Sequence, residues 1–391
     1  MFNFDEVIDR RNSSSLKWRS ETNHFSGLPA RADLLPMWIA DMDFRVAEPI
    51  TEALQREIGS GILGYGYTPE SYREAVVGWQ RRRFGWQVGT ECVVQTPGVG
   101  HSVNMAIQAF TQPGDIIAVL TPVYIHLHYD VILNDRQLTT IPLTHADNTY
   151  RFDAEVFERA LLPGTKMFIL CNPHNPTGNV WSRDELRTIA SICQERNILV
   201  VSDEVHQDLI FAEGMRHIPF ASLSEHSANH SVICTGPSKT FNTAGLQCAN
   251  VFIVNPVLRK AFTLQLERCG MAMNNTMGTV ACEAAYRYGE PWADAMLGYI
   301  GANRRHFASR AKALGLPFSV TRADALYLAW LDFRSLNMTS QELHELLVKD
   351  AGIWLDIGTK YNDGGEGFMR INLACPRERI EDALSRLARI A

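Results

Sequence analysis

The sequence has no apolar run long enough to cross a bilayer, no C-x-x-C pair and no excess of positive charge. A membrane-spanning helix needs about 20 mostly apolar residues, so none is expected here. The formal net charge of -6 gives no electrostatic basis for binding nucleic acid or an anionic membrane. The amino-terminal M-F-N-F-D-E-V-I-D-R-R lacks the apolar segment of a signal peptide. These absences predict a soluble, cytoplasmic protein.

The eight cysteines show no zinc-ligand spacing, so no metal site is predicted; they stand at positions 92, 171, 193, 234, 248, 269, 282 and 375. Several of them lie in apolar runs, as small core residues do in a reducing compartment. With 46% hydrophobic and 20% charged residues, the 391-residue chain has an ordinary globular composition. It is long enough for two or three domains, and it contains no internal repeat or low-complexity linker.

Short apolar segments alternate with helical patterns from Cys92 onward, which indicates an α/β fold with a mainly parallel sheet. Seven strands are expected, at 92–95, 116–120, 138–142, 166–171, 198–202, 231–235 and 249–254. Helices are expected at 48–59, 69–84, 99–111, 123–133, 153–161, 182–195, 256–269, 276–288 and 291–314. Ser182 and Glu185 predict a capping box at the start of the helix 182–195.

The carboxyl-terminal part predicts a smaller α+β unit, with strands at 326–332, 353–357 and 368–373 and helices at 340–350 and 376–390. Residues 1–35 are mostly polar with scattered aromatics, including Phe25, and resemble an arm that packs on another part of the protein. The expected division is therefore an arm with part of the small domain at 1–47, a large domain at 48–288 and a small domain at 289–391.

A lysine follows directly after one of these apolar strands, in V-I-C-T-G-P-S-K-T-F-N-T-A-G-L from Val232 to Leu246. The carboxyl end of a central strand opens into the crevice where α/β sheets bind ligands, and Lys239 would lie there. Partial burial would lower the pKa of its amine and make the amine a nucleophile toward carbonyls. The alternative interpretation is a solvated loop lysine.

Two polar motifs follow neighbouring strands. C-N-P-H-N-P-T-G, residues 171–178, has two prolines that stiffen a loop and fix its asparagines. L-V-V-S-D-E-V-H, residues 199–206, ends a buried strand at Asp203, whose carboxylate needs a cationic partner. The adjacent Glu204 is a candidate cap. In L-P-M-W-I-A-D-M-D-F, residues 35–44, Asp41 and Asp43 are either caps or part of a polar site, and caps are the expected role.

Two further stretches suggest ligand contacts. Q-T-P-G-V-G-H-S-V, residues 95–103, joins a strand to a helix through two glycines, and amides at a helix start bind phosphate. The alternative is a tight turn without a ligand. Tyr124 follows the next strand, where its ring would either stack on a flat cofactor or belong to the core. The glycine-rich G-I-L-G-Y-G-Y, residues 61–67, presents two tyrosines.

One cofactor has a group for each of these features. Pyridoxal 5′-phosphate (PLP) offers an aldehyde to a lysine, a pyridinium nitrogen to an aspartate, a ring oxygen to an asparagine and a phosphate to amides. The order of the motifs resembles the fold-type-I PLP-dependent enzymes, the class I and II aminotransferase superfamily, over nearly the whole chain. P-M-W-I-A-D-M-D-F, N-P-H-N-P-T-G, S-D-E-V-H, P-S-K-T-F-N and R-I-N resemble its MalY/PatB branch of cystathionine β-lyase-type C–S lyases.

The resemblance implies a seven-stranded, mainly parallel sheet in a large domain, a smaller α+β domain, and a role for each matching residue. Lys239 would form the internal aldimine, Asp203 would pair with the pyridinium nitrogen, and Asn175 would bind the ring oxygen. Tyr124 would stack on the ring, and His206 stands where many relatives have a tyrosine. The amides of Val99 and Gly100 and the Ser238 hydroxyl would bind the phosphate, together with Tyr65 from the other subunit of a homodimer. Arg370 would bind the substrate α-carboxylate.

Two departures from the aminotransferase pattern favour a lyase. Gln247 stands where classical aminotransferases have an arginine, and Gly236 stands where a serine is common. The implied reaction is α,β-elimination from cystathionine or a similar S-substituted cysteine, giving a thiol, pyruvate and ammonia. The alternatives are a PLP-dependent aminotransferase and a dual-role protein that is also a regulatory binding module.

Overall fold

The computed structural model describes residues 2–19 and 33–390, so Phe25 of the expected arm lies outside the described residues. Seven strands form the central sheet in the order β2-β10-β9-β8-β7-β3-β4, and only β10 runs antiparallel to its neighbours there. Their bounds are β2 Val93–Thr96, β3 Ile116–Thr121, β4 Gln137–Pro142, β7 Thr165–Cys171, β8 Leu199–Asp203, β9 Ser231–Thr235 and β10 Ala249–Phe252. The predicted α/β class and mainly parallel seven-stranded sheet are confirmed.

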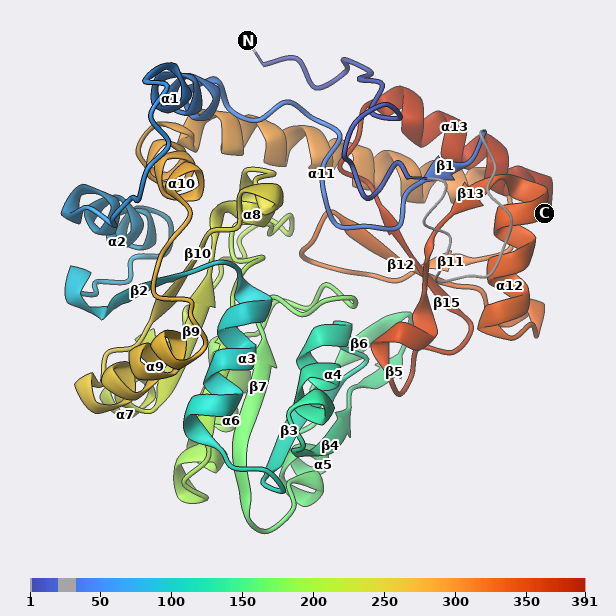
Figure 1. Cartoon of the computed structure of the whole chain (residues 1–391). Coiled ribbons are helices and arrows are strands. Elements are labelled where there is room, and N and C mark those ends of the chain that lie inside the picture. The colour runs from blue at the N-terminus through green and yellow to red at the C-terminus, as the bar shows by residue number, and fades with distance from the viewer. Residues whose placement is uncertain (1, 20–32, 391) are drawn as a thin grey trace.

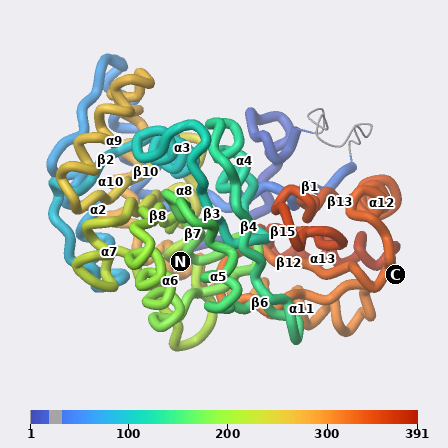
Figure 2. Tube along the Cα trace, turned by 90° about the horizontal axis from the view of Figure 1, so that it is seen from below, coloured from blue at the N-terminus to red at the C-terminus, as the bar shows by residue number. Residues whose placement is uncertain are grey.

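Helices cover both faces of this sheet (Figures 1 and 2). Side chains alternate between the faces along a strand. Ile117 and Val119 of β3 therefore pack in the apolar cluster that contains α3, α4 and α9, whereas Ala118 and Leu120 pack in the cluster that contains α2, α6 and α10. The helices of this part are α1 Glu48–Gly59, α2 Glu70–Phe84, α3 Val99–Phe110, α4 Ile125–Leu133, α5 Ala154–Ala160, α6 Arg183–Glu195, α7 Glu225–Asn229, α8 Pro237–Thr240, α9 Pro256–Arg268 and α10 Thr276–Tyr288.

The predicted capping box of α6 is present: Ser182 Oγ accepts from the Glu185 amide at 3.2 Å, and the Glu185 carboxylate accepts from the Ser182 amide at 2.8 Å. The long helix α11 (Glu290–Ala313) runs from the large sheet toward a second, smaller sheet (Figure 1). None of the helices in the described ranges combines the length and the apolarity that crossing a membrane requires.

The smaller sheet is antiparallel, with the order β11-β12-β15-β14. Its strands are β11 Ser319–Val320, β12 Leu328–Asp332, β14 Asp356–Ile357 and β15 Phe368–Asn372, and helices α12 Ser340–Leu346 and α13 Arg377–Leu387 lie in the same part. The single strand expected at 353–357 is two short strands, because β13 (Ile353–Trp354) pairs instead with β1 (Leu35–Pro36). A hairpin of β5 (Thr144–Ala146) and β6 (Thr149–Arg151) was not predicted.

The segment after β1 crosses from the small sheet to the large one. The Met37 carbonyl accepts from the Asn372 amide at 2.9 Å, and the Asp43 amide donates to the Ala374 carbonyl at 3.0 Å. The expected capping role of Asp43 is wrong. Its carboxylate is buried and forms ion pairs with Lys17 at 2.8 Å and Arg10 at 2.9 Å, which offset the cost of burying the charge.

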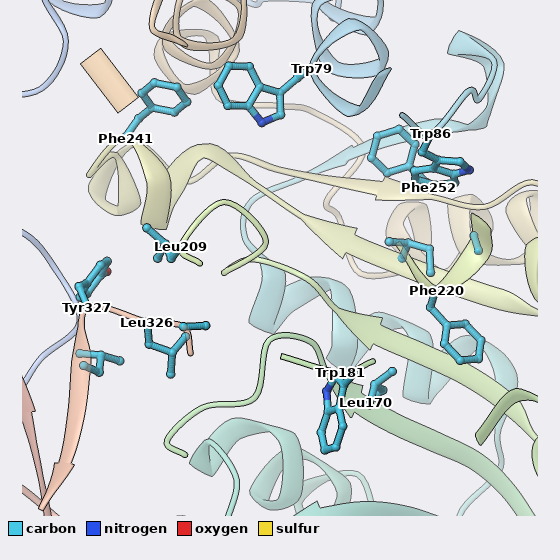
Figure 3. Packing of buried hydrophobic residues seen from close by; sticks show 14 of the residues in the cluster. Trp79, Trp86, Leu170, Trp181, Leu209, Phe220, Phe241, Phe252, Leu326 and Tyr327 are labelled. Atoms are coloured by element: carbon cyan, nitrogen blue, oxygen red, sulfur yellow. The ribbon is translucent and has the colours of Figure 1, made fainter. Parts of the chain in front are cut away.

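Side chains of the small unit also pack into the large apolar core (Figure 3). Leu326 and Tyr327 lie near Leu209, and the Leu326 amide donates to the Leu209 carbonyl at 2.8 Å. On the other side of the core, the rings of Trp79 and Phe241 pack edge to face, with their centroids 5.5 Å apart. Phe241 directly follows helix α8, so the segment that carries Lys239 is anchored by the packing of Phe241 against Trp79.

Candidate active site

The carboxyl ends of three adjacent parallel strands bring the predicted polar motifs together. Cys171 of β7, Asp203 of β8 and Cys234 of β9 stand in register across the sheet. Beyond the strands, the Asn172 amide donates to the Asp203 carbonyl at 2.8 Å, and the Glu204 amide donates to the Cys234 carbonyl at 2.8 Å. The N-P-H-N-P-T-G loop, Asp203 and the strand that leads to Lys239 therefore share one edge of the sheet.

Asp203 is a buried carboxylate at the centre of this edge. Its side chain accepts a hydrogen bond from the Val205 amide at 3.1 Å and forms no ion pair within the described part of the chain. Burial raises its pKa from 3.8 to about 6, although the Val205 amide and the Lys239 charge act in the opposite direction. The carboxylate therefore lacks the cation that the sequence led us to expect.

Lys239 lies in the short helix α8, one turn past the end of β9, rather than in a loop. Its Nζ donates to the Ala40 carbonyl at 2.7 Å, and the Tyr327 hydroxyl donates to the same oxygen at 3.1 Å. Burial, followed by the positive charge of Arg370, lowers the lysine pKa from 10.5 to about 8. The amine is therefore easier to deprotonate than a solvated lysine.

The N-P-H-N-P-T-G loop is fixed from both sides. Asn172 Nδ2 donates to the Ile218 carbonyl at 3.1 Å, and His174 Nε2 lies 2.8 Å from the Pro122 carbonyl. Gly178 has a φ of +73°, and a Cβ there would lie 2.8 Å from the Ala325 carbonyl, so the close approach requires glycine. This packing holds Asn175 in a single position.

Arg370 extends from β15 of the smaller sheet to this edge. Its guanidinium is buried: Nη1 donates to Asn175 Oδ1 at 3.1 Å, and Nη2 donates to the Trp38 carbonyl at 2.9 Å and to Asp356 Oδ2 at 3.0 Å. Its Nε is buried and has no hydrogen-bond partner among the residues described. Three of the five N–H donors of the guanidinium are thus used, and Nε and the second N–H of Nη1 are left for a ligand.

Tyr124 and His206 complete the group, and both are neutral near pH 7. Burial raises the pKa of Tyr124 to about 12. Burial and the charges of Lys239 and Arg370 lower the pKa of His206 well below 6.5. His206 Nδ1 has no hydrogen-bond partner in the described ranges. The Tyr124 amide donates to the Asn175 carbonyl at 3.0 Å, which ties the start of α4 to the loop.

The expected phosphate-binding groups lie at helix starts. Val99 and Gly100 are the first two residues of α3, where backbone amides have no partner within the helix. Ser238 lies in the first turn of α8, and its hydroxyl makes no hydrogen bond with the described residues. Gln247 is exposed with a φ of 49°. At Gly236, a Cβ would lie only 3.3 Å from the Cys248 carbonyl, so a serine there would be tightly packed.

Tyr65 does not join this group. Its side chain is 94% exposed on the loop between α1 and α2, and it has no hydrogen bond, ion pair or ring contact with the described residues of its own chain. Neighbouring apolar side chains on the loop are also exposed, with Ile62 at 79%, Leu63 at 68% and Tyr67 at 82%. A run of apolar side chains this exposed is typical of a surface that another protein chain covers.

The arrangement fits PLP. Among the described residues, a buried carboxylate without an ion pair matches a pyridinium nitrogen, an amine of lowered pKa matches an aldehyde, and helix-start amides without a partner match a phosphate. Asn175 could hold the ring oxygen, and Tyr124 could cover the ring. Arg370 could hold a carboxylate through its free Nε.

Sequence reasoning missed three contributors to this site. Ala40 contributes only its carbonyl, which no side-chain pattern reveals. Tyr327 binds that carbonyl from 287 positions away in the chain. Asp356 lies directly opposite Arg370 in the β14–β15 pair. The sequence did carry a signal for it, because Asp356 is an acid within the otherwise apolar I-W-L-D-I. Glu204, expected as a cap, is instead buried and accepts from Ser202, His217 and the Phe220 amide.

Comparison with known proteins agrees with this arrangement. The sequence model of a family described as aminotransferase class I and II matches residues 33–387. Cystathionine beta-lyase PatB of Bacillus subtilis (strain 168) is 42% identical over 387 residues, which cover 98% of each protein. Protein MalY of Escherichia coli (strain K12) is 31% identical over 390 residues, covering 99% of this chain and 98% of MalY. The structure of cystalysin from Treponema denticola, which contains a PLP cofactor, aligns with a TM-score of 0.94 at 33% identity, covering 99% of this chain and 98% of its own.

Proposed function

The chain belongs to the aminotransferase class I and II family, and on that premise we propose that it is a PLP-dependent C–S β-lyase. Its substrates would be L-cystathionine and similar S-substituted cysteines, which it would cleave with water to a thiol, pyruvate and ammonia. The observation that carries this choice of reaction is the 42% identity to a cystathionine beta-lyase across 98% of both chains.

When bound, PLP supplies an electron sink that stabilises negative charge at the substrate Cα. Lys239 would hold the cofactor and then, as a free amine, remove the Cα proton. Its lowered pKa in the cofactor-free chain, about 8, shows that its surroundings favour the neutral amine that this step needs. Asp203 would accept a hydrogen bond from the protonated ring nitrogen, whose charge compensates the buried carboxylate. Loss of the β-substituent as a thiolate would then follow from the charge placed on Cα.

The remaining residues would orient the reactants. Asn175 would donate to the ring oxygen through Nδ2, because its Oδ1 already accepts from Arg370 at 3.1 Å. Tyr124 would stack on the ring, and the neutral His206 would lie near the ring oxygen. Val99, Gly100 and Ser238 would bind the phosphate, and Arg370 would bind the α-carboxylate of the substrate. Gln247 is exposed and uncharged, so in this chain the phosphate would rely on amides and hydroxyls.

One assay tests the reaction. Purified holoprotein is given L-cystathionine without any keto acid, and pyruvate and free thiol are measured. A lyase releases both in equal amounts over many turnovers. An aminotransferase, the alternative that the family name keeps open, needs a keto acid for more than one turnover and releases no thiol. Absence of thiol release together with turnover on added keto acid would favour the aminotransferase.

We also propose a homodimer in which Tyr65 binds the phosphate held by the other subunit. Two facts support this: Tyr65 is 94% exposed and forms no hydrogen bond, ion pair or ring contact with the described residues of its own chain, and its loop exposes a row of apolar side chains. The domain division at residues 1–47, 48–288 and 289–391 remains our proposal, supported by the two separate sheets. A cytoplasmic location is also proposed, because the eight cysteines are unpaired, as is typical of reducing compartments.

A further inference from the structure

Arg370 is part of a cluster of three charged side chains that contains two cations and one anion. Asp356 lies between them: its Oδ2 is 3.0 Å from Arg370 Nη2 and its Oδ1 is 2.9 Å from Lys360 Nζ. The pairing is built into the backbone. Asp356 stands opposite Arg370 in the β14–β15 register, and Lys360 follows Asp356 by one turn, in the short helix Gly358–Tyr361.

Other contacts hold the three groups in place. The Tyr361 hydroxyl donates to Asp356 Oδ2 at 2.7 Å, and the Tyr361 ring lies 5.2 Å from the Arg370 guanidinium. Trp38 contacts both cations, since its carbonyl accepts from Arg370 at 2.9 Å and its ring lies 5.5 Å from Lys360 Nζ. The exposed fraction rises outward through the cluster, from 4% for the Arg370 side chain to 11% for Asp356 and 26% for Lys360.

The charges of this cluster decide what it can bind. Arg370 and Asp356 alone would be neutral, and adding a substrate carboxylate would leave one uncompensated negative charge in a largely buried place, which is costly. With Lys360 the cluster carries one net positive charge, so one bound carboxylate makes it neutral. Lys360 thereby leaves the charge of Arg370 available.

We propose that Lys360 is a positioning residue for the α-carboxylate of the amino-acid substrate, acting through Asp356. It does not touch the carboxylate; it neutralises Asp356 so that Arg370 binds an anion. This inference rests on the proposed function, because it takes Arg370 as the carboxylate-binding group. It predicts that Lys360 affects ligands with a carboxylate and leaves amines without one unaffected.

The test compares binding of L-alanine and ethylamine to holoprotein, because the two differ only by the carboxylate. Binding is followed by the change in the absorption band of the cofactor and by calorimetry. Lys360→Met should weaken L-alanine binding about tenfold and leave ethylamine binding unchanged, since one nearby charge at partial exposure is worth about 1.4 kcal/mol. Lys360→Arg should retain the wild-type affinities.

A compensating variant separates charge from structure. Lys360→Met combined with Asp356→Asn restores one net positive charge and keeps an oxygen that accepts from Arg370, so L-alanine affinity should recover. The matched control is Lys349→Met, which removes a lysine from an exposed pair with Glu345 at 2.7 Å and should change nothing. Unchanged L-alanine binding in Lys360→Met, or equal loss for both ligands, would overturn the proposal. If the double variant does not fold, the Lys360→Met and Lys360→Arg results decide it.

Failure of this inference is distinguishable from failure of the proposed function. Arg370→Gln should abolish the preference for L-alanine over ethylamine, and retention of that preference would disprove the carboxylate role of Arg370. Absence of pyruvate and thiol release from L-cystathionine, with the alanine results as expected, would disprove the lyase and leave the role of Lys360 standing.

Discussion

Lys239 and Tyr327 donate hydrogen bonds to one shared acceptor, the carbonyl oxygen of Ala40, at 2.7 and 3.1 Å. The lysine lies in α8, just past β9 of the large sheet, and the tyrosine lies in the segment that leads into β12, so this oxygen joins both parts of the protein beside a buried amine. A protonated lysine donates to such an oxygen, and loss of the proton, which the lowered pKa of this amine favours, weakens the bond.

Reduction with borohydride should fix the cofactor on Lys239. We expect the purified protein to be yellow, and mass spectrometry of the reduced protein to find the pyridoxyl group on the peptide that contains Lys239. Lys239→Ala should show no label and should lose activity by about 10²- to 10⁴-fold or more, because the proton-removing group is gone. A label on another lysine of the wild-type holoprotein would show that the site is misassigned.

Lys239→Met should stabilise the cofactor-free protein below pH 8. The lysine pKa is about 8 in the folded chain and 10.5 in the unfolded chain. Burial of the charged amine therefore lowers the free energy of unfolding below pH 8. That cost declines as the pH rises from 8 to 10.5, because the folded chain is already largely deprotonated in this range while the unfolded chain is still losing its proton. Thermal unfolding of the two apoproteins from pH 7 to 10.5 should show a gap that narrows with pH; a constant gap would contradict the lowered pKa.

Asp203→Asn should lose catalysis and keep the fold. The asparagine cannot hold a proton on the ring nitrogen, so turnover should fall by at least tenfold. The apoprotein should be at least as stable as wild type at pH 8, because the folded pKa of about 6 lies above 3.8. Stability of the wild type therefore falls as the pH rises from 3.8 to 6, by a total on the order of 3 kcal/mol. Turnover near that of wild type would mean that another group tunes the ring.

Arg370→Lys should raise KM far more than it lowers kcat. A lysine lacks the planar fork that binds a carboxylate through two parallel hydrogen bonds, and it cannot reach Asn175, Trp38 and Asp356 together. The lost charge-assisted hydrogen bond is worth about 1.5–3 kcal/mol, or tenfold to a hundredfold in KM. Steady-state kinetics with L-cystathionine measures both constants; an unchanged KM would remove Arg370 from substrate binding.

Subunit exchange tests the shared site. Tyr65→Phe should weaken PLP retention by tenfold to a hundredfold, because one hydroxyl bond to a charged phosphate is lost. When inactive Lys239→Ala protein is mixed with a severe Tyr65 variant, each heterodimer should contain one site with both lesions and one site with neither. Activity should therefore partly return. Heterodimers that form and remain inactive would show that Tyr65 serves its own chain.

The sequence was most informative where backbone pattern and side-chain chemistry are local. All seven strands of the large sheet were predicted within a few residues, because each is a short apolar run bounded by turn residues. Asp203 and the N-P-H-N-P-T-G loop were recognisable because a polar group at the end of a buried strand costs free energy unless it has a binding partner. The reversed direction of β10 could not be predicted, because its residues suit a buried strand in either direction.

Contacts between segments that are distant in the chain could not be predicted from the sequence either. The expected cap at Asp43 was wrong because its partners, Lys17 and Arg10, lie in an arm whose position no local pattern gives. The Ala40 carbonyl was missed for the same reason, because the chain brings it to Lys239 across 199 residues. Asp356 is different: it stands only 14 residues before Arg370, and its position within the apolar I-W-L-D-I was a local signal that was overlooked.

The bond between the Trp38 carbonyl and Arg370 also bears on synthesis of the protein, because its two ends are 332 residues apart in the chain. At a translation rate of about 5–20 residues per second, the arginine leaves the ribosome about 15 to 70 seconds after the tryptophan. The hydrogen bond from the Asn372 amide to the Met37 carbonyl likewise cannot form until Asn372 has been translated. A nascent chain that already contains Lys239 and Asp203 therefore still lacks the guanidinium of Arg370, and this edge of the sheet is completed only after β15 has been translated.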